Sequence, residues 1–195
     1  MAKPNSLRHC KGCPLCGNPK VWSDGDPASP VYFVGRNPGR VEVESGIPFT
    51  GRAGGRLDKV LADLEVNRGS VYITNLVKCW TPNDDEPPTE AVEHCWPYLK
   101  VELVGVVDTF AGFVKRNAIV VALGKQCQKF LTEKEVSYFP MIHPAAALRK
   151  GQHEAVLRRD TRLLKKALEE VCHVEKERAM DGKPSKRNSK RESSS

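Results

Sequence analysis

Residues 31–40 read VYFVGRNPGR, and this stretch decides the fold class. Its first four residues are apolar or β-branched and predict a short buried strand, and Gly35, Pro38 and Gly39 predict a sharp turn at the end of it. Ligands of open α/β sheets bind at the carboxyl ends of strands. The stretch therefore predicts a central strand followed by a binding site, although an ordinary loop after a strand is the alternative for so short a motif.

Strand and helix patterns alternate through the rest of the chain. Three further apolar runs predict strands, at residues 71–74, 119–123 and 136–141. Apolar residues at helical spacing predict helices at 55–66, from the candidate N-cap Thr89 to Leu103, from Gly124 through Phe130, and at 153–171. Four strands alternating with helices predict an α/β protein with three α/β/α layers and a central four-stranded parallel sheet.

Polar residues follow the predicted strands. Asn37, Asn75, Gly124 and His143 each come at or just after the carboxyl end of a different strand. Because those ends meet at one edge of a parallel sheet, we expect these residues to converge there. Such convergence is typical of a functional site.

Length and charge limit the function classes. A chain of 195 residues suits one compact domain, predicted over residues 1–172, and residues 173–195 are so poor in apolar side chains that we expect a disordered basic tail. The net charge is +7, of which the tail carries +3, and this favours an anionic partner such as nucleic acid over a merely solvated surface. No apolar run approaches the ~20 residues of a membrane span and no signal peptide is visible, so we expect a cytoplasmic monomer without membrane contact.

The cysteines form two separated pairs. Cys10 and Cys13 are three residues apart, and Cys79 and Cys95 lie far downstream, so the fold could bring four thiolates around zinc or an iron-sulfur cluster. The loose second pair favours a cluster over a zinc ribbon. Cys16 makes an equally spaced pair with Cys13, so spacing alone allows either Cys10 or Cys16 as a ligand. The remaining two, Cys127 and Cys172, are expected to be ordinary buried or surface thiols.

Seven motifs together resemble those of the family 4 uracil-DNA glycosylases, the iron-sulfur members of the uracil-DNA glycosylase superfamily. In chain order they are CKGCPLC, GRNPG, GIPFTGRAGGRL, VYITNLVKCW, EHCWPYL, IVVALG and HPAAALR. The resemblance extends over residues 7–171. It implies that Cys10, Cys13, Cys79 and Cys95 hold a 4Fe-4S cluster of structural role, and that the substrate is a flipped-out uracil in single- or double-stranded DNA.

The resemblance also implies roles for individual residues. Gly35, Phe49 and Asn75 would bind the base, with Phe49 stacking on it and Asn75 reading its Watson-Crick edge. His143 would stabilise the leaving base, and the segment after it would bring Leu148 and Arg149 to the DNA. Phe49 as a core residue and Asn75 as a turn residue are the plainer alternatives.

The central turn departs from the family pattern. The family has G-E-A-P-G, whereas this chain has Gly35-Arg-Asn-Pro-Gly39, which resembles the turn of the mismatch-specific and single-strand-selective relatives. We therefore expect Asn37 to orient the water, Arg36 to turn outward to a DNA phosphate, and Glu42 to lie near the base. Two other readings remain open: a degenerate member that binds DNA without cleaving it, and a zinc-binding structural protein.

Overall fold

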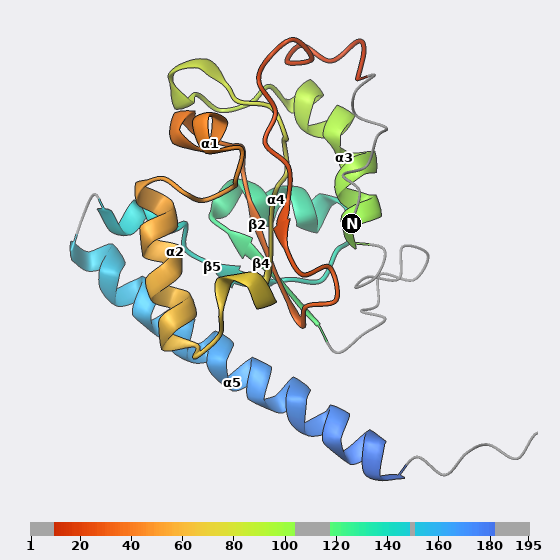
Figure 1. Ribbon diagram of the computed structural model, residues 1–195, viewed down its shortest axis with the longest axis vertical. Coiled ribbons are helices and arrows are strands. Elements are labelled where there is room, and N and C mark those ends of the chain that lie inside the picture. Colours follow the sequence, from red (N-terminus) through yellow and green to blue (C-terminus); the bar gives the residue numbers. More distant parts are fainter. Residues whose placement is uncertain (1–9, 104–117, 149–150, 182–195) are drawn as a thin grey trace, which may run out of the picture.

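A five-stranded sheet forms the centre of the computed structural model, which describes residues 10–103, 118–148 and 151–181 (Figure 1). In spatial order the strands are β1 (Asp24–Gly25), β3 (Tyr72–Asn75), β2 (Val31–Gly35), β4 (Ile119–Leu123) and β5 (Phe139–Met141). β3, β2, β4 and β5 pair in parallel, and β1 is an antiparallel edge strand. The predicted parallel core is confirmed, and the two-residue β1 is an addition that its length and Gly25 hid from the pattern.

Helices cover both faces of this sheet, as the three-layer prediction requires. Side chains of α2 (Arg52–Asp63) and α5 (Gly151–Asp181) pack with Phe33 and Ile73 on one face. Those of α3 (Thr89–Leu103) and α4 (Lys125–Glu133) pack with Tyr32 and Val34 on the other. Alternate residues of β2 thus face opposite layers, and all five are buried because both faces are covered.

Short elements complete the connections. α1 (Arg40–Ser45) follows the central turn, and three 3₁₀ turns lie at η2 (Arg68–Ser70), η3 (Pro82–Asp84) and η4 (Pro144–Leu148). None of the helices in the described part of the chain is both long and apolar enough to cross a membrane.

Several predicted boundaries shift in the structure. β5 begins at Phe139 rather than Val136, because Val136 packs among the side chains of the α4 face and its N–H closes the end of α4 on the Leu131 carbonyl. Helix α3 begins at Thr89 itself, and the carbonyl of Pro88 accepts the first amide hydrogen bonds. α1 was not predicted, since six residues show too little of a helical period.

The closing helix is longer than its apolar face. α5 runs to Asp181 and in Figure 1 extends past the sheet. Residues 173–181, which the sequence assigns to a disordered tail, therefore continue the helix. Residues 173–181 are rich in Glu, Lys, Arg, Ala and Met, which are good helix formers and need no new nucleation here. The rest of the predicted tail, residues 182–195, lies outside the described residues.

An irregular arm holds the first cysteines against the domain. Residues 10–30 contain almost no regular structure, and this arm is joined to the loop after β3 by a bridge between Lys20 and Cys79. Backbone hydrogen bonds from Val21 to Lys78 and from Trp80 to Pro19 extend that joint. A third small core forms beneath the arm and contains Cys13, Leu15, Val77, Cys79, Ala91 and Cys95.

Candidate active site

A cleft opens at the carboxyl ends of the parallel strands, where the sequence predicts convergence. Its volume is about 740 Å³. β3 contributes Asn75, the turn after β4 contributes Gly124, and the segment after β5 contributes His143. From the first part of the chain come Arg36, Asn37, Glu42 and Phe49, and η4 adds Leu148.

Gly35 brings Asn75 and Phe49 together. A Cβ atom at Gly35 would lie 2.4 Å from Oδ1 of Asn75 and 2.6 Å from two ring atoms of Phe49. No side chain fits there, so the absence of a side chain at Gly35 leaves room for Asn75 and Phe49 in the cleft. Phe49 is 6% exposed and adopts a positive φ of 55°, an unusual conformation for an aromatic residue that often marks functional sites. Phe49 therefore belongs both to the core, as its plainer reading held, and to the cleft lining.

Asn75 carries a buried acceptor without a partner. Asn75 is 3% exposed, and its Oδ1 accepts no hydrogen bond from any residue that the structure describes. Leaving a buried polar atom unpaired costs about 1–3 kcal/mol. Such an atom in a cleft indicates a donor supplied from outside, that is, from a ligand.

A buried ion pair holds the backbone of Asn75 in place. Nζ of Lys78 donates to the Asn75 carbonyl at 2.8 Å, to Oγ1 of Thr74 at 2.5 Å and to Oε2 of Glu102 at 2.6 Å. The side chains of Lys78 and Glu102 are 1% and 6% exposed, so each neutralises a charge that could not be buried alone. This support is not predicted from the sequence, although the four-residue spacing from Thr74 to Lys78 is visible there.

A hydrogen bond to one ring nitrogen orients His143. The backbone N–H of Ala145 donates to Nδ1 at 3.1 Å, so the neutral imidazole carries its proton on Nε2 and can donate from there. The ring centroid lies 5.9 Å from that of Phe49, with 30° between the planes. Gly124 permits this placement, because a Cβ there would lie 3.0 Å from Cβ of His143.

Arg36 and Asn37 do not diverge, contrary to the expectation. Nε of Arg36 donates to Oδ1 of Asn37 at 2.6 Å, Nη1 donates to Gln126 at 3.2 Å, and both residues line the cleft. Nδ2 of Asn37 donates to Oγ1 of Thr81 at 2.7 Å. The expectation was wrong because side-chain alternation holds within a strand, and β2 ends at Gly35. Thr81 and Gln126 were missed, although Gln126 follows the same strand end as Gly124.

Glu42 supplies a carboxylate to the cleft. It lies on α1, is 8% exposed, and accepts a hydrogen bond from the Gly51 N–H at 3.1 Å. Among the described residues that line the cleft it is the one acidic side chain. Leu148 lies at the end of η4 on the same cleft, and Arg149 lies outside the described residues.

Four thiols gather between the arm, the loop after β3 and α3. Cys13, Cys79 and Cys95 are buried in the third core, Cys10 packs against them, and Cys16 is exposed outside it. Burial, reinforced by the neighbouring thiols, raises the pKa of Cys79 to about 12 and also raises the pKa of Cys10 and Cys95. The structure thus groups Cys10, and not Cys16, with the other three.

No single-ion metal site forms in the part of the chain that the structure describes. Among the described residues, no three His, Cys, Asp or Glu side chains form a site for one metal ion.

Cys127 lies apart from the four grouped thiols. It is fully buried on the sheet side of α4, and burial raises its pKa to about 12. It is the buried thiol that the sequence predicts, and the side chain of Cys172 is not described.

Comparison with known proteins identifies this architecture. Residues 22–171 match the model of the uracil DNA glycosylase superfamily, and the chain belongs to that superfamily. It is 36% identical to the type-4 uracil-DNA glycosylase of Pyrobaculum aerophilum over 74% of this chain and 82% of the relative. It is also 34% identical to that of Saccharolobus solfataricus, over 84% of both chains, and 31% identical to that of Thermotoga maritima, over 76% and 82%. Within the superfamily the chain is therefore a member of the type-4 uracil-DNA glycosylases, as its motifs indicate.

Proposed function

We propose that this chain hydrolyses the N-glycosidic bond of uracil in DNA and so begins base-excision repair. Membership of the type-4 family supports the proposal, and one observation carries it: the buried, unpaired Oδ1 of Asn75 in the cleft. A carboxamide at that position offers uracil an acceptor for its N3–H and a donor for its O4. Cytosine carries an acceptor at N3 and a donor at C4, so the same amide held in this orientation would reject it.

Phe49 would hold the flipped base by stacking. Its ring lies against Gly35 and near His143, and base–aromatic stacking contributes about 1–3 kcal/mol. Extrusion of the nucleotide costs a few kcal/mol, which stacking and the Asn75 hydrogen bonds can offset. Leu148, on the cleft at the end of η4, would occupy the gap left in the duplex, with Arg149 on the DNA beside it.

His143 would stabilise the departing base. When the bond between C1′ and N1 breaks, its electron pair moves to the base and negative charge accumulates on O2. Nε2–H of His143 is the donor suited to that charge, because Nδ1 is occupied by the Ala145 N–H. One well-placed donor of this kind contributes about 2.7–4 kcal/mol to the transition state, and the imidazole needs to lose no proton to do so.

Asn37 and Glu42 would have different roles toward the water that attacks the sugar. Oδ1 of Asn37 accepts from Arg36 and retains one lone pair, enough to accept a hydrogen bond from one water molecule and orient it toward C1′. An amide cannot take the proton of that water at neutral pH. Glu42, the carboxylate of the cleft, is the group that can receive it and offset positive charge on the sugar.

Arg36 would slow this reaction while helping the protein to hold DNA. Its guanidinium is tied to Asn37 at 2.6 Å, so it stands near the water and the sugar cation. A unit charge ~5 Å away at an effective dielectric of ~20 opposes that cation by about 3 kcal/mol. The same charge can pair with the phosphate of the flipped nucleotide, and we expect slow but real excision.

The four grouped thiols would hold a 4Fe-4S cluster. Tetrahedral zinc with bonds of ~2.3 Å requires its sulfur atoms ~3.8 Å apart, whereas a cluster has one thiolate at each of four separate iron corners. The grouping of Cys10, Cys13, Cys79 and Cys95 without a single-ion site fits the larger group. When bound, the cluster ties the irregular arm to α3 and the loop after β3, and hydrolysis of a glycosidic bond calls for no electron from it.

A second candidate function is DNA binding without cleavage. It is favoured by the central turn, where Arg36 stands in the place of the family carboxylate and occupies an oxygen lone pair of Asn37. The test is to incubate the cluster-loaded protein in excess with uracil oligonucleotides, single-stranded and paired, and to cleave abasic products with alkali. Strand cleavage at uracil supports the glycosylase, and a DNA complex that releases no uracil supports the second candidate.

A further inference from the structure

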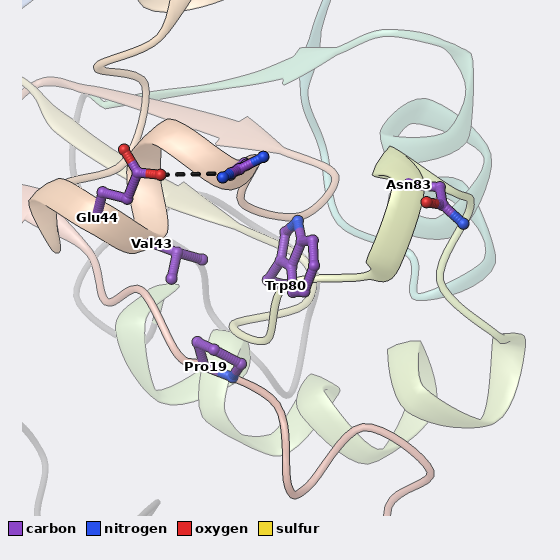
Figure 2. Close-up of a pocket in the computed structure, with 6 residues that line it drawn as sticks. Pro19, Val43, Glu44, Trp80 and Asn83 are labelled. Carbon is purple, nitrogen blue, oxygen red and sulfur yellow. Dashed lines mark ion pairs between the residues drawn. The ribbon is translucent and has the colours of Figure 1, made fainter.

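A second pocket lies beside the active-site cleft (Figure 2). Its volume is about 420 Å³. It is formed between the cysteine arm, α1 and the loop that leads from Cys79 into η3, and its lining residues are Pro19, Arg40, Val43, Glu44, Trp80 and Asn83. Arg40 lines both this pocket and the cleft, so a strand that leaves the cleft along α1 would meet the pocket next.

Trp80 is presented to this pocket by a fixed backbone. Its N–H donates to the Pro19 carbonyl at 2.9 Å, and its carbonyl accepts from Nδ2 of Asn18 at 2.9 Å. In Figure 2 the indole lies between Val43 and Pro19 on one side and Asn83 on the other. Trp80 is only partly buried, and it lines the pocket, so part of its large apolar side chain is available for contact with a ligand there.

The indole also has an unused donor. Nε1 of Trp80 is buried and donates to no acceptor in the described part of the chain. A buried Trp N–H usually has a partner, so this one indicates an acceptor brought by a ligand. Nucleobases and phosphates both carry such acceptors.

Arg40 adds a positive charge that is available to a ligand. Its side chain is 83% exposed and pairs with Glu44, 65% exposed, at 3.4 Å. An exposed pair of this kind contributes about 0–1 kcal/mol, so Arg40 can leave Glu44 for a phosphate at little cost. An aromatic side chain next to an exposed arginine is an arrangement with which proteins bind single-stranded nucleic acid.

We propose that this pocket binds an unpaired base of the same DNA strand, next to the nucleotide in the cleft. The base stacks on Trp80, and Arg40 contacts the phosphate between the two nucleotides. The inference rests on the proposed function only in that DNA occupies the cleft. It predicts a preference for single-stranded or locally opened DNA, because the base of a closed duplex cannot reach the indole.

The test is a binding experiment that needs no cleavage. Oligonucleotides carry one 2′-fluoro-deoxyuridine, which resists excision, and an abasic residue placed in turn at each neighbouring position. Affinities are measured by fluorescence anisotropy for the cluster-loaded parent protein, Trp80→Ala and Trp80→Phe. The matched control is Trp22→Ala, because Trp22 is also partly buried but lines neither pocket.

One neighbouring position should be special. There the parent should lose about 5- to 140-fold in affinity when the base is removed, Trp80→Ala should be nearly insensitive, and Trp80→Phe should keep most of the effect. Trp22→Ala should behave as the parent. Because each protein is compared with itself on two DNAs, an overall loss of stability in Trp80→Ala does not imitate this result.

Other outcomes separate the hypotheses. Equal base dependence in the parent and in Trp80→Ala overturns the proposal. A position-specific effect in a protein that excises no uracil would uphold this pocket and overturn the proposed glycosylase activity.

Discussion

Replacing Arg36 with alanine should speed the chemical step and weaken DNA binding. The guanidinium donates to Oδ1 of Asn37 at 2.6 Å and so holds a positive charge beside the water that would attack the sugar. Removing a charge that opposes the sugar cation by about 3 kcal/mol sets a ceiling of ~10²-fold on the gain. We expect about tenfold, because a DNA phosphate near Arg36 would already screen part of that charge.

The assay must separate rate from affinity. Single-turnover excision with saturating protein gives the chemical rate, and anisotropy on the 2′-fluoro oligonucleotide gives the affinity. Arg36→Gln keeps an N–H donor for Asn37 without the charge, so it distinguishes electrostatics from loss of the hydrogen bond. Arg52→Ala is the control, because Arg52 is exposed on the same cleft and should affect binding alone. A chemical rate in Arg36→Ala equal to or below that of the parent would refute this reasoning.

Three further changes test separate parts of the structure. Gly35→Ala should leave the protein folded but lower uracil excision at least ~10²-fold, since its Cβ would displace Asn75 and Phe49; normal excision would mean that the base binds elsewhere. Cys95→Ser should abolish the brown colour and visible absorbance of the purified protein, whereas Cys16→Ser should keep both, and the reverse pattern would show the ligand set to be wrong. Truncation after Asp181 removes five basic and one acidic residue and should flatten the salt dependence of DNA affinity, by up to ~0.7–0.9 in log–log slope for each lost phosphate contact; an unchanged slope would show that residues 182–195 do not touch DNA.

The main lines of the fold could be predicted because its signal is local. Strands β2 and β4 are continuous apolar runs, as parallel strands buried on both faces must be, and the helices between them show the helical period. Once the strands were identified, the topology of a parallel sheet was enough to bring Asn75 and His143 to one edge.

Other features could not be predicted from the sequence, because they depend on contacts outside the strands or on cysteines with the same spacing. Arg36 lies just after β2, where alternation no longer fixes side-chain direction, and its contact with Gln126 joins residues 90 apart. Cys10 and Cys16 are equally spaced from Cys13, so only the packing of the arm separates them. The end of α5 was missed because its last turns are held by helix propensity and carry no apolar face.

The ion pair that supports Asn75 could not be predicted for a similar reason. Lys78 meets Glu102 across 24 residues, and a lysine and a glutamate in isolation read as solvated charges. Their burial becomes intelligible only when the backbone of Asn75 is seen to accept from the same ammonium group.

The most direct test of the account is single-turnover excision by the parent and Asn75→Asp on matched oligonucleotides that carry uracil or cytosine at one position. We expect the parent to release uracil and not cytosine, and Asn75→Asp to excise uracil at least ~10-fold more slowly, because it loses the amide donor and places a negative charge beside the departing base. Asn67→Asp, the same change at an exposed site, should match the parent. Equal uracil release by Asn75→Asp and the parent, or no release by the parent from any uracil oligonucleotide, would contradict the central claim.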